Sequence, residues 1–277
     1  MTQLWCNGQW LAPQDFPASP TDRGSILGLG LFETVLAIDG RLVFADRHLA
    51  RLRKSCERLG WNPELPDLRE AAEELLVRNA LATGRARLRL AVTAGSGRID
   101  ELAPGGDSLV WMTAAWINGE VTEAVSANLA PWKRNEHSPL AGLKCASYAE
   151  NLIALDHARQ RGFQQTLFLN TAGHLCEAAT ANLFLVTDGT LLTPPLSSGC
   201  LPGITREVVI ELAGGLGIPC EERDLMLETL QSADGAFLTS SVQGITGISR
   251  FEDRILGACA VTDRLSRALN EVIARGD

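Results

Sequence analysis

The chain has 277 residues, a net charge of −8 and a hydrophobic fraction of 45%. Its length exceeds that of a typical single domain, so one large or two medium domains are expected. The acidic balance argues against a nucleic-acid binder, because a phosphate backbone needs a basic surface. No apolar run reaches the roughly 18 residues of a membrane helix. Any anionic substrate must therefore be held by individual arginines of a globular protein.

Residues 1–8 contain no basic region followed by an apolar run, so we expect no secretory signal and a cytoplasmic location. The seven cysteines are scattered, without a C-x-x-C pair or the spacing of a metal site. Isolated cysteines in an odd number are typical of reduced thiols that pack as small apolar side chains. We therefore expect neither a disulfide framework nor a bound metal.

The N-terminal part of the sequence predicts two hairpins and then a helix. The hairpins have strands over 4–6 and 32–38 and turns at Asn7-Gly8 and Asp39-Gly40. Asp46 is the predicted N-cap of the helix, and Gly60 ends it. Its apolar stripe consists of Leu49, Leu52, Cys56 and Leu59. Arg51 lies off this stripe, so it is expected on the surface unless it binds a ligand.

A second helix over 67–82 and strands over 87–92 and 109–116 follow, and a glycine-rich loop over 94–106 separates the two strands. The polar stretch 118–120 is the predicted linker. It divides the chain into a smaller N-terminal domain, residues 1–117, and a larger C-terminal domain, residues 121–277.

In the second half, strands alternate with helices. Ser147 and Glu150 form a predicted capping box for a helix that ends before Gly162. Lys144 therefore lies on a turn just before a helix. Further strands are expected over 166–170, 182–186, 190–192 and 235–239 and near Ile248, with helices over 205–213 and at the C-terminus. Together these elements predict an α+β fold.

A Pro-Gly turn at Pro202-Gly203 leads into the helix that contains Ile204 and Thr205. The first backbone N–H groups of such a helix point at one place, and the helix dipole favours an anion there. The motif is consistent with a phosphate site, but by itself it favours an ordinary capped helix. Most helix starts bind nothing, so the motif alone does not decide.

Lys144 is surrounded by uncharged residues, from Pro139 to Leu143 and at Cys145-Ala146. An apolar setting favours the neutral, nucleophilic form of a lysine amine, as a Schiff-base lysine requires. The alternative is a lysine whose stem packs on apolar surface while its ammonium group reaches water. The surroundings of the lysine must decide between the two.

The sequence resembles the class IV aminotransferases over essentially its whole length. Five motifs occur in the order of that family: Gly28-x-Gly30-x-Phe32-Glu33-Thr34, His48-x-x-Arg51-Leu52, Leu143-Lys144, Glu177-x-x-x-x-Asn182-Leu183-Phe184 and Leu201-Pro202-Gly203-Ile204-Thr205-Arg206. The family includes branched-chain aminotransferases, D-amino acid aminotransferases and 4-amino-4-deoxychorismate lyases. The resemblance implies the two-domain fold type IV of pyridoxal-phosphate enzymes and a homodimer.

The resemblance also implies roles for three charged residues. Lys144 would bind pyridoxal 5′-phosphate covalently and move the proton between the substrate's α-carbon and the cofactor. Glu177 would pair with the pyridine nitrogen, which keeps the ring able to accept electrons. Arg51 would grip the phosphate, for which a guanidinium is well suited.

Further cofactor contacts follow from the same resemblance. Ile204 and Thr205 would form the phosphate cup, Ser241 would add a second hydroxyl, and Leu201 would pack on the ring face. Tyr148, the only tyrosine, stands where some relatives place a tyrosine that hydrogen-bonds the cofactor's phenolic oxygen. A buried helix tyrosine is an equal alternative.

The substrate is expected to be a small, anionic, amino-acid-like molecule. Arg98, in the loop 95–98, stands where relatives present an arginine to the substrate carboxylate, and a surface loop is the alternative. Phe32 replaces the tyrosine of D-amino acid aminotransferases, and the Arg-x-His of those enzymes is absent at Arg98. Both differences argue against a D-amino acid substrate.

Among the possible reactions, the sequence features favour a 4-amino-4-deoxychorismate lyase, which releases pyruvate to give 4-aminobenzoate. The residues 140–144, the short glycine loop and the chain length are similar to those of such lyases, whereas Ser147 stands where many have asparagine. An aminotransferase for branched-chain or other small amino acids is the alternative. A non-catalytic binding protein with this fold is a remote third possibility, because Lys144, Glu177 and Arg51 are all present.

Overall fold

The computed structural model describes residues 2–63, 68–117 and 124–276. The chain forms two compact units. The first contains Met1–Gly119, Leu143–Ser147 and Gly276–Asp277, and the second contains Glu120–Gly142 and Tyr148–Arg275. The predicted linker at 118–120 lies outside the described residues. The segment around Lys144 was expected in the C-terminal domain, whereas it groups with the first unit because its backbone bonds to a strand there.

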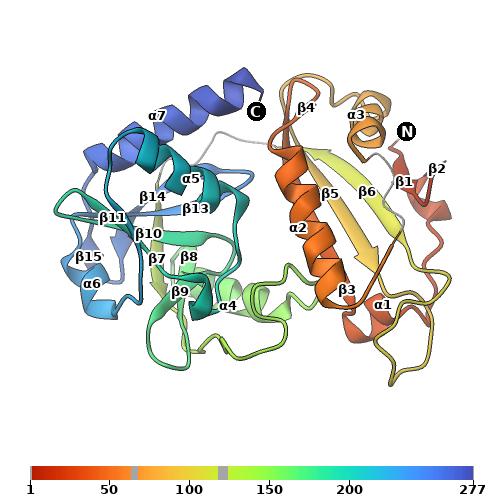
Figure 1. The fold of residues 1–277 in the computed structure, drawn as a ribbon, viewed down its shortest axis with the longest axis horizontal. Coiled ribbons are helices and arrows are strands. Elements are labelled where there is room, and N and C mark those ends of the chain that lie inside the picture. Colours follow the sequence, from red (N-terminus) through yellow and green to blue (C-terminus); the bar gives the residue numbers. More distant parts are fainter. Residues whose placement is uncertain (1, 64–67, 118–123, 277) are drawn as a thin grey trace. The chain divides into compact units, whose positions relative to one another are not determined.

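The first unit contains a six-stranded antiparallel sheet with the order β2-β1-β6-β5-β3-β4 (Figure 1). Its strands are β1 (Leu4–Cys6), β2 (Gln9–Leu11), β3 (Gly30–Ile38), β4 (Arg41–Leu42), β5 (Arg85–Thr93) and β6 (Val110–Trp116). Its helices are η1 (Pro13–Asp15), α1 (Arg23–Leu27), α2 (Ala45–Arg58) and α3 (Leu68–Arg78). Helix α2 packs on β3, and Leu31, Leu52 and Leu88 are part of the core of this unit.

Both predicted hairpins are confirmed. Asn7 and Gly8 have φ angles of 45° and 84°, and Asp39 and Gly40 have φ angles of 48° and 77°. Two consecutive residues in the left-handed region are what a tight two-residue hairpin turn requires. The turn sequence therefore sets the strand register locally, with Cys6 opposite Gln9 and Ile38 opposite Arg41.

The start of α2 differs from the prediction. Phe44, with a left-handed φ of 53°, is the N-cap, and no side chain among the described residues caps the helix. Asp46 instead lies in the first turn, where its carboxylate accepts a hydrogen bond from Arg69 at 3.1 Å. A carboxylate there still interacts favourably with the helix dipole. The predicted N-cap therefore lies two residues after the observed one, and the acidic side chain does not cap the helix.

The second unit contains a nine-stranded sheet with the order β12-β11-β10-β13-β14-β7-β8-β9 and β15 beside β14. Strand β9 also pairs with β10, which closes the strands β10, β13, β14, β7, β8 and β9 into a barrel. The first of its strands are β7 (Ala124–Leu129), β8 (Gln165–Leu169), β9 (Leu175–Ala178) and β10 (Asn182–Thr187). The others are β11 (Thr190–Thr193), β12 (Cys220–Glu222), β13 (Gly235–Ser240), β14 (Gly244–Phe251) and β15 (Arg254–Ile255).

The helices of this unit are α4 (Ala149–Gln160), η2 (Leu196–Ser198), α5 (Ile204–Gly215), α6 (Leu227–Ser232) and α7 (Ala260–Arg275). Helices α5 and α7 contact each other and strand β13, as Figure 1 shows. The core is aliphatic, with Leu167, Leu183 and Leu238 among its fully buried side chains. Helices and a largely antiparallel sheet in each unit confirm the predicted α+β class.

The predicted capping box before α4 is wrong. Tyr148 is the N-cap and makes no side-chain cap within the described chain. The Ser147 hydroxyl donates to the carbonyl of Gly28 at 3.2 Å, and Glu150 pairs with Arg134 at 2.7 Å. Both side chains therefore make tertiary contacts in place of local ones. Among the described residues, no helix is long and apolar enough to cross a membrane.

Candidate active site

The backbone around Lys144 is bonded to the start of β3. The Phe32 N–H donates to the Lys144 carbonyl at 2.9 Å, and the Ala146 N–H donates to the Gly30 carbonyl at 2.7 Å. A Cβ at Gly30 would lie 3.1 Å from the Ala146 Cβ, so the glycine permits this close approach. Gly30, from the first of the five sequence motifs, thus lets the segment around Lys144 pack closely against β3.

Two cations contact the Phe32 ring. The Lys144 Nζ lies 4.4 Å from the ring centroid, and the Arg89 Cζ lies 3.6 Å from it. Cations at these distances are attracted by the negative face of the ring. Phe32 and Lys144, both predicted site residues, are therefore neighbours in the first unit. Arg89 was not predicted as a site residue, although its alternation with buried Leu88 and Leu90 placed it on the polar face of β5.

Arg51 is buried, which excludes the alternative of a plain surface charge on α2. Its Nε donates to Glu33 Oε1 at 2.8 Å and its Nη2 donates to Glu33 Oε2 at 2.6 Å. The His48 Nδ1 lies 2.7 Å from Oε2 of the same carboxylate, which can only accept that hydrogen bond. The three residues come from two of the sequence motifs and form one buried charged cluster.

The electrostatics of this cluster stabilise an ionised Glu33. Burial by itself would raise the pKa of this carboxyl, which is 1% exposed. The charge of Arg51 and the hydrogen bonds from Arg51 and His48 outweigh burial and lower the pKa from 4.5 to about 2. The His48 Nε2 is buried without a hydrogen-bond partner among the described residues. Glu33 thus fixes the orientation of the Arg51 guanidinium.

Arg98 is on the surface of the first unit, with 70% of its side chain exposed. It donates to Asp100 through Nε at 3.0 Å and through Nη2 at 2.8 Å, and it pairs with Glu101 at 3.2 Å. The hydrogen bond from Arg98 lowers the pKa of Asp100. Both carboxylate partners are exposed as well, so these ion pairs are weak and a ligand's carboxylate can replace them.

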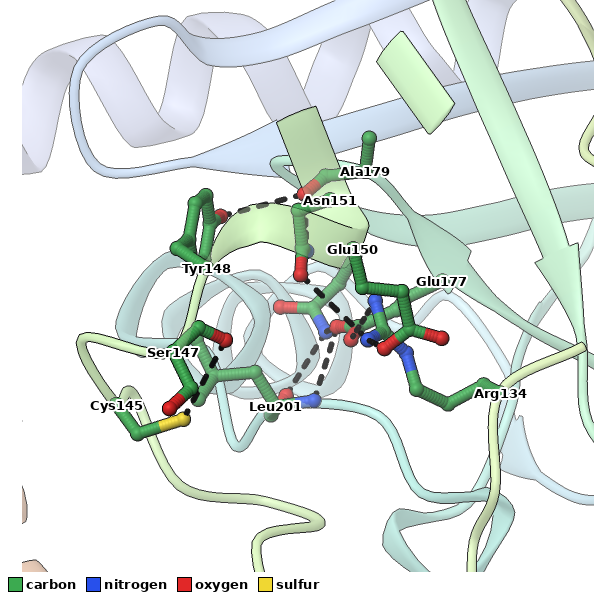
Figure 2. Close-up of polar contacts among 10 residues, drawn as sticks. Arg134, Cys145, Ser147, Tyr148, Glu150, Asn151, Glu177, Ala179 and Leu201 are labelled. Atoms are coloured by element: carbon green, nitrogen blue, oxygen red, sulfur yellow. Dashed lines mark hydrogen bonds and ion pairs between the residues drawn. The ribbon is translucent and has the colours of Figure 1, made fainter. Parts of the chain in front are cut away.

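Glu177 is the centre of a polar network in the second unit (Figure 2). Its Oε2 accepts a hydrogen bond from the Leu201 N–H at 2.9 Å and one from Asn182 Nδ2 at 3.5 Å. The same Nδ2 donates to the Leu201 carbonyl at 2.8 Å. The structure therefore brings together two predicted site residues, Glu177 and Leu201, through Asn182.

Arg134 completes this network and was not predicted. Its Nη2 lies 3.7 Å from Glu177 Oε1, its Nη1 donates to Glu150 at 2.7 Å, and its Cζ lies 4.4 Å from the Phe168 ring centroid. Only 13% of this arginine and 12% of Glu177 are exposed, so the pair is weakly screened. No pattern around Arg134 distinguishes it from a surface arginine.

The phosphate cup predicted at Ile204 and Thr205 is the first turn of α5. Gly203 is the N-cap, no side chain of the described residues caps this helix, and both residues are buried. A Cβ at Gly203 would collide with the Asn182 Oδ1. Asn182 also pairs with Thr239 on β13, two residues before the half-buried Ser241.

Tyr148 is half-buried, and its hydroxyl donates to the Ala179 carbonyl at 3.2 Å. Asn151 donates to the same carbonyl at 2.6 Å, as Figure 2 shows. Tyr148 is therefore fixed at the start of α4. A hydroxyl that donates to a backbone carbonyl can still accept a hydrogen bond from a ligand.

Several known proteins are similar to this chain in sequence and in structure. The family model for class IV amino-transferases matches residues 30–251. A branched-chain-amino-acid aminotransferase of Escherichia coli is 31% identical over 96% of this chain and 91% of its own length. An aminodeoxychorismate lyase of Bacillus subtilis is 27% identical over 90% of this chain and 87% of its own length. The structure of a branched-chain aminotransferase from Thermoproteus uzoniensis, solved with norvaline, is 27% identical with a TM-score of 0.92, over 100% of this chain and 96% of that chain.

Proposed function

We propose, because this chain belongs to the class IV aminotransferase family, that it transfers the amino group of branched-chain or other small amino acids to a keto acid. The observation that carries this proposal is the 31% identity to the Escherichia coli enzyme over 96% of the chain. The lyase reaction, which the sequence features favour, becomes the second candidate, because its relative is 27% identical. The fold type IV architecture implied by the sequence is confirmed.

The cofactor of this family is pyridoxal 5′-phosphate. Two features of the chain fit it: the uncapped, buried first turn of α5 suits a phosphate, and the fixed carboxylate of Glu177 suits a protonated ring nitrogen. When bound, the cofactor accepts the electron pair left on the substrate's α-carbon. The protein has to position the cofactor and move protons.

Lys144 is the proposed catalytic residue. Its amine would hold the cofactor covalently and then carry the proton to and from the substrate's α-carbon. The two backbone hydrogen bonds to β3 keep its main chain in place while the side chain changes partner. The Phe32 ring contacts the amine, with 4.4 Å between Nζ and the ring centroid. Arg89, which contacts the same ring, is a candidate to bind the carboxylate of the substrate.

Glu177, Arg51, Ile204, Thr205 and Ser241 are the proposed polar ligands of the cofactor. Glu177 would accept a hydrogen bond from the protonated ring nitrogen, and its orientation is set by the Leu201 N–H. Arg51 would bind the phosphate with a guanidinium that Glu33 orients. The N–H groups of Ile204 and Thr205 and the hydroxyls of Thr205 and Ser241 would bind it as well. Leu201 and Tyr148 keep their proposed contacts with the ring and its phenolic oxygen.

Arg98 and Phe32 are the proposed substrate contacts. The exposed guanidinium of Arg98 can exchange Asp100 for the α-carboxylate of an amino acid. A homodimer and a cytoplasmic location also remain predictions for this chain, and size-exclusion chromatography with light scattering tests the first. Amino-acid-like substrates agree with the activities named for its relatives.

The lyase candidate rests on a separate observation. Residues 140–144 are similar to the segment before the lysine in aminodeoxychorismate lyases, and the Bacillus subtilis lyase matches 90% of the chain. One experiment separates the two reactions. The purified protein, loaded with pyridoxal phosphate, is given L- and D-amino acids with 2-oxoglutarate, and separately aminodeoxychorismate. Keto acid formation from L-leucine, L-isoleucine or L-valine supports the transferase, whereas 4-aminobenzoate and pyruvate without transamination would replace it by the lyase.

A further inference from the structure

Arg23 is a charged side chain buried in the first unit, at the first residue of α1. Only 1% of it is exposed. Its guanidinium makes no ion pair with a carboxylate of the described residues, and its hydrogen bonds within this part of the chain all go to backbone carbonyls. Burying a guanidinium is costly unless all its donors are satisfied. The acceptors of this guanidinium therefore show what the burial of Arg23 achieves.

Five carbonyl groups surround this guanidinium, and all belong to one stretch of the loop between β5 and β6. Nε donates to Gly95 at 3.1 Å, Nη1 donates to Glu101 at 2.7 Å and to Arg98 at 3.4 Å, and Nη2 donates to Ala94 at 3.0 Å and to Ala103 at 2.7 Å. A guanidinium has five N–H donors, so donors and acceptors match in number. The loop is wrapped around Arg23.

The loop and α1 fit each other in shape as well. A Cβ at Gly97 would lie 2.7 Å from the Arg23 Cζ, so a side chain there would displace the guanidinium. Asp22, the N-cap of α1, accepts a hydrogen bond from Thr93 at 2.8 Å, next to the start of the loop. The Arg23 N–H donates to the Gly95 carbonyl at 3.0 Å. The close fit at Gly97 and these two hydrogen bonds therefore hold the start of the loop against the N-terminus of α1.

We propose that Arg23 is the positioning residue of the loop 94–103 and thereby determines how Arg98 meets the carboxylate of the substrate. Arg98 has no buried anchor of its own, because its side chain is 70% exposed, but its carbonyl is bound by Arg23. The inference rests on the proposed role of Arg98 in substrate binding. Arg23 itself touches neither substrate nor cofactor in this role.

Arg23→Met and Arg23→Lys test the anchor from the side of α1, and Gly97→Ala tests it from the side of the loop. Gly106→Ala is the matched control in the same loop, since a Cβ there meets nothing within 4 Å. Arg254→Met is the control for a lost arginine, because Arg254 donates to two carbonyls in the second unit, Leu230 and Ala233, at 2.6 and 2.7 Å.

The first measurement is trypsin cleavage of the holoenzyme after Arg98, followed by mass spectrometry. Arg23→Met and Gly97→Ala should be cut at least about tenfold faster than the wild type, the change that follows from losing the hydrogen bond to the Arg98 carbonyl alone. Arg23→Lys should lie between, since a lysine offers fewer donors. Both control variants should be cut at the wild-type rate.

The second measurement is steady-state kinetics with L-leucine and 2-oxoglutarate. The KM for L-leucine should rise by about tenfold in Arg23→Met and Gly97→Ala, with kcat and cofactor absorbance retained. An unchanged cleavage rate, or faster cleavage with an unchanged KM, overturns the proposal, as does an equal KM rise in Arg254→Met. If Arg23→Met does not fold, Gly97→Ala decides alone. Failure of the wild type to turn over any substrate would instead contradict the proposed function, while the cleavage assay still reports on the anchor.

Discussion

The Arg51 guanidinium and the Glu33 carboxylate form a bidentate ion pair inside the first unit, with N–O distances of 2.8 and 2.6 Å. The arginine predicted to bind phosphate is therefore oriented by a buried acid, and the conformation of its long side chain is fixed before any ligand binds. A pre-oriented guanidinium loses less entropy when it binds a phosphate.

Glu33→Gln should destabilise the protein by about 3–5 kcal/mol, because it leaves a buried guanidinium without its counter-charge. The free energy of unfolding is measured by urea titration monitored by tryptophan fluorescence. Glu74→Gln is the control, since it removes an exposed carboxylate that pairs with Arg78 on α3 and should cost less than about 1 kcal/mol. Equal losses of unfolding free energy in both variants would show that the buried pair stabilises the protein no more than the exposed pair does.

Acid should weaken the first unit through the same carboxylate. Because the folded-state pKa of Glu33 is about 2 and its ordinary value is 4.5, its contribution is complete above about pH 4.5 and is lost as the pH falls toward 2. The shift corresponds to about 3 kcal/mol. The difference in unfolding free energy between wild type and Glu33→Gln, measured from pH 6 downward at about half-unit steps, should therefore shrink. A difference that stays constant would contradict this pKa.

Lys144 should carry the cofactor. Reduction of the holoenzyme with borohydride should fix a phosphopyridoxyl group on the peptide that contains Lys144, because a Schiff base becomes a stable amine. Lys144→Ala should lose the label and the visible absorbance. Lys133→Ala, which removes an exposed lysine bonded to the Thr171 carbonyl, should keep both. A wild-type protein that stays colourless with added cofactor would support the non-catalytic alternative.

Gly203→Ala should weaken cofactor binding by roughly tenfold, since the added methyl group displaces the Asn182 amide that links Glu177 to Leu201. The dissociation constant is measured by titrating the apoenzyme with pyridoxal phosphate. Gly214→Ala lies in the same helix with nothing within 4 Å of its Cβ. It should leave binding unchanged and stabilise α5 by up to about 1 kcal/mol. Similar dissociation constants for pyridoxal phosphate in both variants would show that Gly203 does not support cofactor binding.

Local structure was predictable where a few adjacent residues determine it. The dipeptides Asn7-Gly8 and Asp39-Gly40 specify their hairpins because they tolerate positive φ angles. Asp46 and Ser147 misled the capping predictions for a physical reason: a short polar side chain before a helix can cap it or bond elsewhere. Here the Ser147 hydroxyl donates to the Gly28 carbonyl, and a contact between residues so distant in sequence cannot be predicted from the local pattern.

The site was predictable to the extent that family motifs carry it. Lys144 with Phe32 and Glu177 with Leu201 are neighbours, as their motifs imply. The burial of Arg51 was missed, because helical periodicity marks apolar faces and cannot show that a charged residue has a buried acid as its partner. Partners distant in sequence determine such contacts.

The cluster of Glu33, His48 and Arg51 has a consequence for anyone who redesigns this protein. One carboxylate serves both the arginine and the histidine, so loss of Glu33 leaves a guanidinium and a ring nitrogen without their acceptor, and loss of Arg51 leaves the carboxylate without its counter-charge. Libraries that vary Glu33 or Arg51 alone should therefore consist mostly of destabilised members. Joint replacement by a well-packed apolar trio should restore folding and leave the cofactor without its arginine, which separates the structural task of this cluster from its chemical one.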